Sequence, residues 1–189
     1  MYSFRNDYSE GAHPLVIQAL TDTNLEQTVG YGLDPRCETA RALIRSLCNA
    51  PAADVHFLVG GTQTNMIVIE SLLQPYEAVI SAHTGHVNVH ETGAIEATGH
   101  KVLPLPSGDA KITAAQVEEA VWAHRNDGSF EHMTQPKLVY ISNPSELGTL
   151  YSLEELEALS ETCRKLGLYL FLDGARMGYG LMAKNYDVT

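Results

Sequence analysis

Short apolar runs alternate with segments of helical apolar spacing along most of the chain. The apolar runs predict strands at residues 55–59, 78–82, 101–105, 138–142 and 168–172. The helical spacing predicts helices at residues 13–20, 62–73 and 87–98, and capping boxes at Thr113 and Ser152 predict the start of two more. Glycines at positions 99 and 167 are suited to end helices. This alternation predicts an α/β fold with a mainly parallel sheet and helices on both faces.

The first part of the chain has a different pattern from the rest. Residues 1–36 contain several glycines and prolines and few apolar runs beyond the helix near 13–20. We expect this segment to be an N-terminal arm and not a separate domain. Residues 37–189 are expected to form one domain.

Composition excludes several classes of partner. The 12 basic and 23 acidic residues give a net charge of −11 with no basic stripe, so we expect neither nucleic acid nor anionic membrane as a partner. No apolar run reaches the roughly 18 residues that a membrane-spanning helix needs. Three cysteines without a CxxC pair argue against a disulfide framework or a structural zinc site. The polar start of the chain lacks a signal peptide, and we expect a cytoplasmic protein.

The segment Asp173-Gly-Ala-Arg176 follows the last predicted strand and is the most informative motif. A carboxylate at the end of a parallel strand lies at the edge where α/β proteins bind ligands. A buried anion there needs a cationic partner or hydrogen bonds. Arg176 could be that partner, or the two side chains could bind two parts of one ligand. A pyridinium nitrogen is a further candidate, since enzymes that use pyridoxal phosphate (PLP) place an Asp against it.

Other polar clusters allow more than one interpretation. Gly60, Gly61 and Thr62 lie between a predicted strand and a helix, where Thr62 could cap the helix and backbone N–H groups could bind a phosphate, or form a plain turn. His83, His86 and His90 could bind a metal, could be solvated or core histidines, or could place an imidazole over a flat ring. We expect no metal ligands, because the HExxH pattern is absent. Asn143 ends another predicted strand and is either an ordinary turn residue or part of the same edge.

Taken in order, these motifs resemble those of the threonine aldolase/β-eliminating lyase family of fold-type I PLP enzymes. The resemblance extends over essentially the whole chain and is clearest at residues 4–14, 31–35, 60–65, 86–93, 141–144 and 173–176. It implies that residues 37–189 form the PLP-binding large domain of a fold-type I PLP-dependent transferase, incomplete at its C-terminus, and that residues 1–36 contribute to a subunit interface. PLP is then the cofactor, and a homodimer or homotetramer is the assembly.

The resemblance also implies roles for individual residues. Gly61 and Thr62 would hold the PLP phosphate, and His86 would stack on the pyridine ring. Asp173 would pair with the ring nitrogen, and Arg176 would contact the phenolic oxygen of the cofactor or the substrate. His132 matches a family histidine near the substrate hydroxyl. Asn6 stands where the family usually has a Ser that helps to bind the substrate carboxylate.

The implied reaction is aldol cleavage of L-threonine, L-allo-threonine or similar β-hydroxy amino acids to glycine and an aldehyde. The resemblance places the Schiff-base lysine well beyond Asp173, and Lys184 is too close in sequence to serve. We therefore expect a truncated chain that is inactive by itself, with activity in the full-length parent. Alternatives are another fold-type I PLP enzyme, either a β-elimination lyase or an aminotransferase, and a non-catalytic structural fragment.

Overall fold

The computed structural model describes residue 3 and residues 5–183. The chain divides into two compact units, Met1–Val55 and His56–Thr189. The predicted boundary between an arm of residues 1–36 and a domain of residues 37–189 stays a prediction. In the part of the chain that the structure describes, no helix is long and apolar enough to cross a membrane.

The first unit contains two helices, α1 (Pro14–Thr23) and α2 (Pro35–Leu47). Each begins with a proline, whose missing N–H would have no partner in the first helical turn anyway. The Asp34 carboxylate caps α2 by accepting hydrogen bonds from the N–H groups of Arg36 and Cys37. The predicted helix near residues 13–20 is present. Helix α2 was not predicted, although the Asp34-Pro35 pair is a start signal for it.

The second unit is built on a parallel sheet of four strands in the order β2-β1-β3-β4. The strands are β1 (Glu77–Ala82), β2 (Lys101–Leu105), β3 (Gln135–Ser142) and β4 (Tyr169–Asp173). They confirm four of the five predicted strands. Because all four run in the same direction, their carboxyl ends lie at one edge of the sheet.

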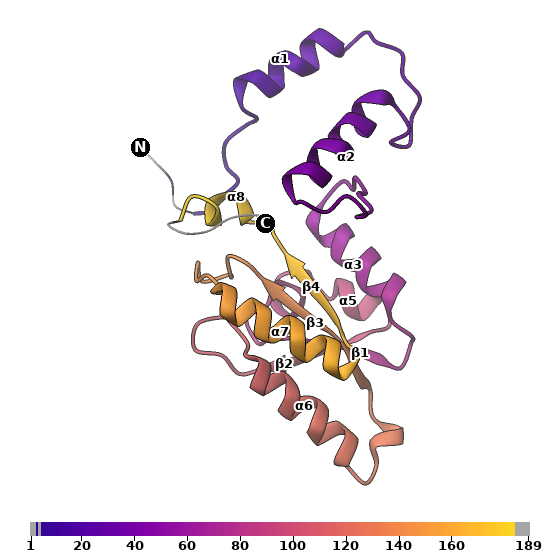
Figure 1. The fold of residues 1–189 in the computed structure, drawn as a ribbon, viewed down its shortest axis with the longest axis vertical. Helices are drawn as coiled ribbons and strands as arrows, with labels where there is room; N and C mark the ends of the chain where they lie inside the picture. The colour runs from indigo at the N-terminus through magenta and orange to yellow at the C-terminus, as the bar shows by residue number, and fades with distance from the viewer. Residues whose placement is uncertain (1–2, 4, 184–189) are drawn as a thin grey trace. The chain divides into compact units, whose positions relative to one another are not determined.

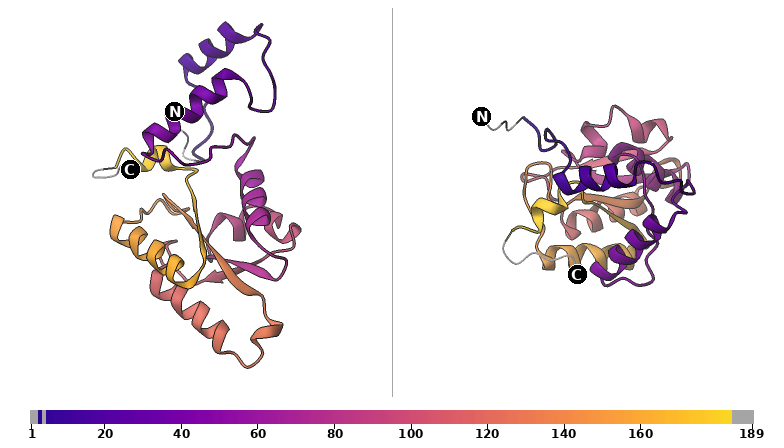
Figure 2. Two further views of the ribbon diagram at one scale, coloured as in Figure 1. Left: turned by 45° about the vertical axis from the view of Figure 1, so that its right-hand side comes forward. Right: turned by 90° about the horizontal axis from the view of Figure 1, so that it is seen from above.

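Helices cover both faces of this sheet, as the pattern predicted (Figures 1 and 2). Helices α6 (Ala114–Asn126) and α7 (Leu153–Leu166) pack on one face, and α3 (Gly61–Leu72) and α5 (Ala94–Ala97) pack on the other. Alternate strand residues supply the two cores: Ile80 and Ile141 face α6 and α7, whereas Val79 and Tyr140 face the other layer. The fold class is therefore confirmed.

Local capping explains where the helices begin and end. Both predicted capping boxes are present, with Thr113 paired to Gln116 at α6 and Ser152 paired to Glu155 at α7. Gly167 ends α7 with a φ of 72°, a left-handed conformation that glycine adopts without steric cost. The remaining elements are the short helices α4 (His86–Val89) and α8 (Met177–Gly180) and the 3-10 helix η1 (Phe130–His132).

Two predicted elements differ from the structure. Residues 55–59 do not form a strand, because no described strand lies alongside them to complete a ladder, and Val59 is 97% exposed. The single helix predicted at 87–98 is instead the two short helices α4 and α5. Thr92 and Gly93 between them have φ values of 52° and 76°, which an α-helix cannot contain.

Candidate functional site

The carboxyl edge of the sheet gathers the polar side chains of the second unit. Asp173 is the last residue of β4 and is paired in register with Ser142, the last residue of β3. The N–H of Asn143 donates to the Asp173 carbonyl at 3.0 Å, so the two strand ends are tied together. The structure thus places the Asp173 carboxyl group at the sheet edge where α/β proteins bind ligands.

Three groups surround the carboxylate of Asp173. The Tyr140 hydroxyl donates to Oδ2 at 2.6 Å, and the Ala175 N–H donates to Oδ1 at 2.9 Å. The Asn65 amide nitrogen lies 3.5 Å from Oδ2. Burial of Tyr140, together with the nearby Asp173 carboxylate, raises the pKa of the phenol far above its ordinary value. Tyr140 therefore remains a hydrogen-bond donor and holds the carboxylate in one orientation.

A second carboxylate, that of Glu91, links α3 to α4. Its Oε1 lies 2.6 Å from Asn65 Nδ2 and 2.7 Å from His86 Nδ1. The Glu91 side chain is fully buried, whereas that of His86 is 36% exposed. The other oxygen of Glu91, Oε2, has no hydrogen-bond partner among the residues that the structure describes. Asn65 therefore lies between two carboxylates, those of Glu91 and Asp173.

Glu146 ties the start of α4 to the end of β3. Its Oε1 accepts hydrogen bonds from the Ser142 hydroxyl at 2.6 Å and from the His86 N–H at 2.9 Å. The Ser142 hydroxyl also lies 3.3 Å from the Tyr140 hydroxyl. His86 is therefore held at its backbone by Glu146 and at its ring by Glu91. Asn65, Glu91, Tyr140 and Glu146 were not predicted as members of this cluster. Asn65 and Glu91 lie in the motifs at residues 60–65 and 86–93, whereas no motif contains Tyr140 or Glu146.

Helix α3 begins at the predicted phosphate cradle. Gly60 is its N-cap residue, and no side chain caps its first turn. Thr62 therefore does not cap the helix as expected, because the helix already begins at Gly61. Both Gly61 and Thr62 are exposed, and a Cβ added at either Gly60 or Gly61 would meet nothing within 4 Å. The N–H groups of this first turn remain open to an anion.

The remaining predicted site residues lie in other parts of the chain. His132 lies in η1, just before the amino end of β3, while Asp173 lies beside its carboxyl end. Since a strand rises about 3.3 Å per residue, the two ends of β3 are roughly 23 Å apart. Asn6 is exposed in the first unit, where its Oδ1 accepts hydrogen bonds from Ser9 and Tyr8. Arg176 is half-buried and lies at the start of α8, three residues after Asp173.

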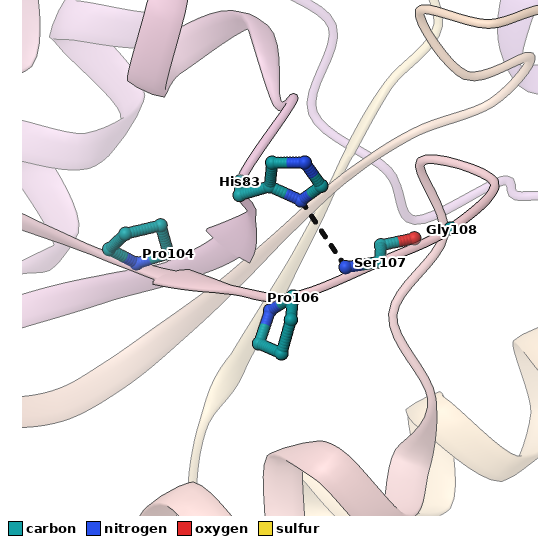
Figure 3. Close-up of a pocket in the computed structure, with 5 residues that line it drawn as sticks. All are labelled: His83, Pro104, Pro106, Ser107 and Gly108. Atoms are coloured by element: carbon teal, nitrogen blue, oxygen red, sulfur yellow. Dashed lines mark hydrogen bonds between the residues drawn. The ribbon is translucent and has the colours of Figure 1, made fainter.

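His83 occupies a different part of the same edge. Its Nδ1 accepts a hydrogen bond from the Ser107 N–H at 3.2 Å, and it lines an open hollow with Pro104, Pro106 and Gly108 (Figure 3). The rings of His86 and His90 are 5.5 Å apart. Within residue 3 and residues 5–183, no three His, Cys, Asp or Glu side chains are arranged to hold a metal ion.

Comparison with known proteins agrees with these motifs. A family profile described as Beta-eliminating lyase matches residues 4–183. A low specificity L-threonine aldolase from a Pseudomonas species is 34% identical over 175 residues, which covers 92% of this chain and 49% of that protein. The low specificity L-threonine aldolase of Saccharomyces cerevisiae is 32% identical, with 91% of this chain and 44% of that protein covered.

A solved structure is also similar over the full chain. A threonine aldolase from Leishmania major superimposes with a TM-score of 0.93 at 49% identity and covers 100% of this chain and 54% of that one. The chain thus spans about half the length of the curated relatives it matches. The resemblance seen in the motifs is confirmed, and the chain belongs to the beta-eliminating lyase family.

Proposed function

We propose that this chain is the cofactor-binding part of a PLP-dependent lyase. The full-length protein would cleave L-threonine, L-allo-threonine or similar β-hydroxy amino acids to glycine and an aldehyde. Family membership and the names of the aldolase relatives support this reaction. The single observation that carries the proposal is the Asp173 carboxylate, held at the carboxyl edge by Tyr140 and Ala175 and flanked by the His86–Glu91 pair.

The residues at this edge fit the chemical groups of PLP. The open first turn of α3, with Gly61 and Thr62, suits a phosphate because its N–H groups and the helix dipole attract an anion. Asp173 is half-buried and supplies an anion for a protonated ring nitrogen. His86 supplies a partly exposed aromatic ring. Arg176 would contact the phenolic oxygen of the cofactor or the substrate.

The bound cofactor would act as the electron sink for the carbanion left when the Cα–Cβ bond breaks. Asp173 would hold a proton on the ring nitrogen, and Tyr140 would keep the Asp173 carboxylate facing that proton. His86 would limit movement of the ring by packing on it. His132 would lie near the substrate hydroxyl of a second copy, because the amino end of β3 is too far from Asp173 for contact within one chain.

The lysine that binds the cofactor would lie outside the described residues. Lys111 and Lys165 bind Glu155 and Glu118, and the Lys137 ammonium donates to the Gly167 carbonyl. Lys101 is the first residue of β2, at the amino edge of the sheet. Lys184 is also outside the described residues. We therefore propose that this chain alone does not turn over substrate.

Assembly and location are part of the same proposal. The apolar side chains Leu15, Leu20, Leu43 and Leu47 of α1 and α2 are more than half exposed, and neither helix has a buried residue. We propose that these helices pack against a second copy in a homodimer or homotetramer. A cytoplasmic location is supported by the three cysteines, none of which forms a disulfide.

The test is turnover by the full-length protein with PLP, measured as glycine and acetaldehyde released from L-threonine. Removing one member of a buried charged pair costs about 3–5 kcal/mol, so Asp173→Ala should lose two orders of magnitude or more in kcat. Asp173→Asn should also be poor because an amide cannot supply the charge. Asp127→Asn is the matched control, since the Asp127 carboxylate accepts hydrogen bonds from Ser129, two residues along, outside the site.

Two outcomes would contradict the proposal. Near-native threonine cleavage by Asp173→Asn would show that the Asp173 carboxylate is not needed at the ring nitrogen. Release of pyruvate and ammonia from serine or cysteine, with no glycine from threonine, would instead indicate a β-elimination lyase.

A further inference from the structure

We propose that Glu91 is a positioning residue that holds the His86 imidazole in the tautomer protonated at Nδ1, and that Asn65 couples this pair to Asp173. This proposal rests on the proposed function, because a cofactor beside His86 is what gives the free Nε2 atom a role. We assign Nε2 as the proton-accepting atom. The proposal concerns a carboxylate that the roles implied by the family motifs leave unused.

The hydrogen bonds around Glu91 Oε1 determine the tautomer. The Asn65 amide nitrogen at 2.6 Å can only donate, so Oε1 accepts there. The nitrogen orientation of this amide is favoured because its other neighbour, 3.5 Å away, is also a carboxylate oxygen, that of Asp173. An oxygen that accepts from Asn65 is best completed by a second donor, and the Nδ1–H of His86 at 2.7 Å supplies it. The ring proton is then on Nδ1, and Nε2 carries the lone pair.

Burial makes this arrangement specific. The Glu91 side chain is fully buried, whereas the His86 side chain is 36% exposed. The carboxyl group therefore lies in the protein interior, and part of the imidazole is accessible from the surface. A buried carboxylate oxygen without a partner is costly, and Oε2 of Glu91 has none in the described part of the chain. Such groups are uncommon and call for an explanation, of which a catalytic role is one. The same order of groups, a carboxylate orienting an imidazole that accepts a proton, recurs in general-base catalysis.

Asn65 extends the arrangement to the other carboxylate. It is 3% exposed in α3, and its amide nitrogen is within reach of both Glu91 and Asp173. One side chain therefore sets the spacing between the ring-stacking residue and the ring-nitrogen partner. Asn65→Leu would remove the contacts to both carboxylates, whereas Glu91→Leu would remove the contacts of Glu91 to His86 and Asn65 and leave that between Asn65 and Asp173.

The tautomer can be measured without cofactor. The chain with ¹⁵N-labelled histidine is examined by long-range ¹H–¹⁵N NMR, and the His86 signals among the eight histidines are identified with His86→Gln. We expect protonated Nδ1 and unprotonated Nε2 in the unmodified chain. Glu91→Gln keeps an acceptor and should largely keep this tautomer, whereas Glu91→Leu should lose it. Glu96→Leu, an exposed carboxylate of α5, is the matched control and should leave the signals unchanged.

A His86 ring protonated at Nε2 in the unmodified chain would overturn the proposal, even if Glu91→Leu failed to fold. In the full-length enzyme, loss of a correctly held base should lower kcat about 10² or more with little change in KM, and Glu91→Gln should recover part of it. Equal kcat in Glu91→Leu and the unmodified enzyme would also overturn it. If the unmodified enzyme did not cleave threonine, the proposed function would be contradicted but the tautomer assignment would not, since the tautomer does not depend on turnover.

Discussion

Gly85 is the position at which a single added methyl group should be least tolerated near the site. It lies between the end of β1 and α4, immediately before His86. A Cβ built there would lie 2.0 Å from the Ser81 hydroxyl oxygen and 3.0 Å from the Ala82 carbonyl oxygen. Both residues are buried. Since the Gly85 φ of −56° is open to any residue, the obstacle is packing and not backbone conformation.

The size of the effect follows from these distances. Overpacking a well-packed core typically costs about 1–3 kcal/mol, and Gly85→Ala should destabilise the second unit by that amount. Removing the Ser81 hydroxyl leaves the Ser81 Cβ as the neighbour at 3.4 Å, an ordinary contact, while the Ala82 carbonyl stays at 3.0 Å. Ser81→Ala should therefore recover most, but not all, of the loss, with a coupling energy of about 0.5–3 kcal/mol between the two positions.

The assay is a urea titration of the four proteins of this double-mutant cycle. Trp122, the only tryptophan, lies in α6 and reports on unfolding of the second unit, and far-UV circular dichroism provides a second signal. Gly128→Ala, where a Cβ meets nothing within 4 Å, is the matched control and should stay near the unmodified stability. Gly85→Ala with unchanged stability, or a loss that Ser81→Ala does not reduce, would refute the steric reasoning.

Three further expectations concern parts of the second unit away from the site. The hydrogen-bonded Lys111 ammonium holds the pKa of Glu155 below its usual 4.5. The ionised Glu155 carboxylate therefore stabilises the fold above pH 4.5, and this stabilisation is lost as the pH falls through the lowered pKa. The difference in unfolding free energy between the unmodified chain and Glu155→Gln, about 1 kcal/mol or less, should shrink below pH 4.5, and an increase would contradict this reasoning. Tyr151→Phe should cost about 1–3 kcal/mol in urea titration because the buried Ile112 N–H loses its acceptor at 2.8 Å, whereas Tyr76→Phe, at an exposed side chain, should be neutral. Burial raises the pKa of the Cys163 thiol to about 11, so iodoacetamide followed by peptide mass spectrometry should label Cys163 far more slowly than the exposed Cys48, and equal rates would show that Cys163 is accessible.

Local chemistry determined much of the fold directly from the sequence. The capping boxes at Thr113 and Ser152 and the glycine at 167 act within a few residues, so their helices begin or end where the sequence predicts. The central strands β1 and β3 are buried between two helical layers, as their apolar composition indicated, whereas the edge strands β2 and β4 are only partly buried. The strand-end position of Asp173 follows from the same local pattern.

Only the tertiary structure determined which strands pair and which distant residues meet, because local sequence patterns hold no information about either. Residues 55–59 have the composition of a strand but lack a neighbouring strand, and a ladder needs hydrogen bonds from elsewhere in the chain. Asn65 lies in α3, Glu91 between α4 and α5, and Tyr140 in β3, and they meet Asp173 or His86 only because strand order and helix packing bring them to one edge. His132 precedes Asn143 by eleven residues, yet the two residues lie at opposite edges of the sheet because β3 runs between them. Sequence separation does not measure distance across a parallel sheet, because each strand carries the chain from one edge to the other.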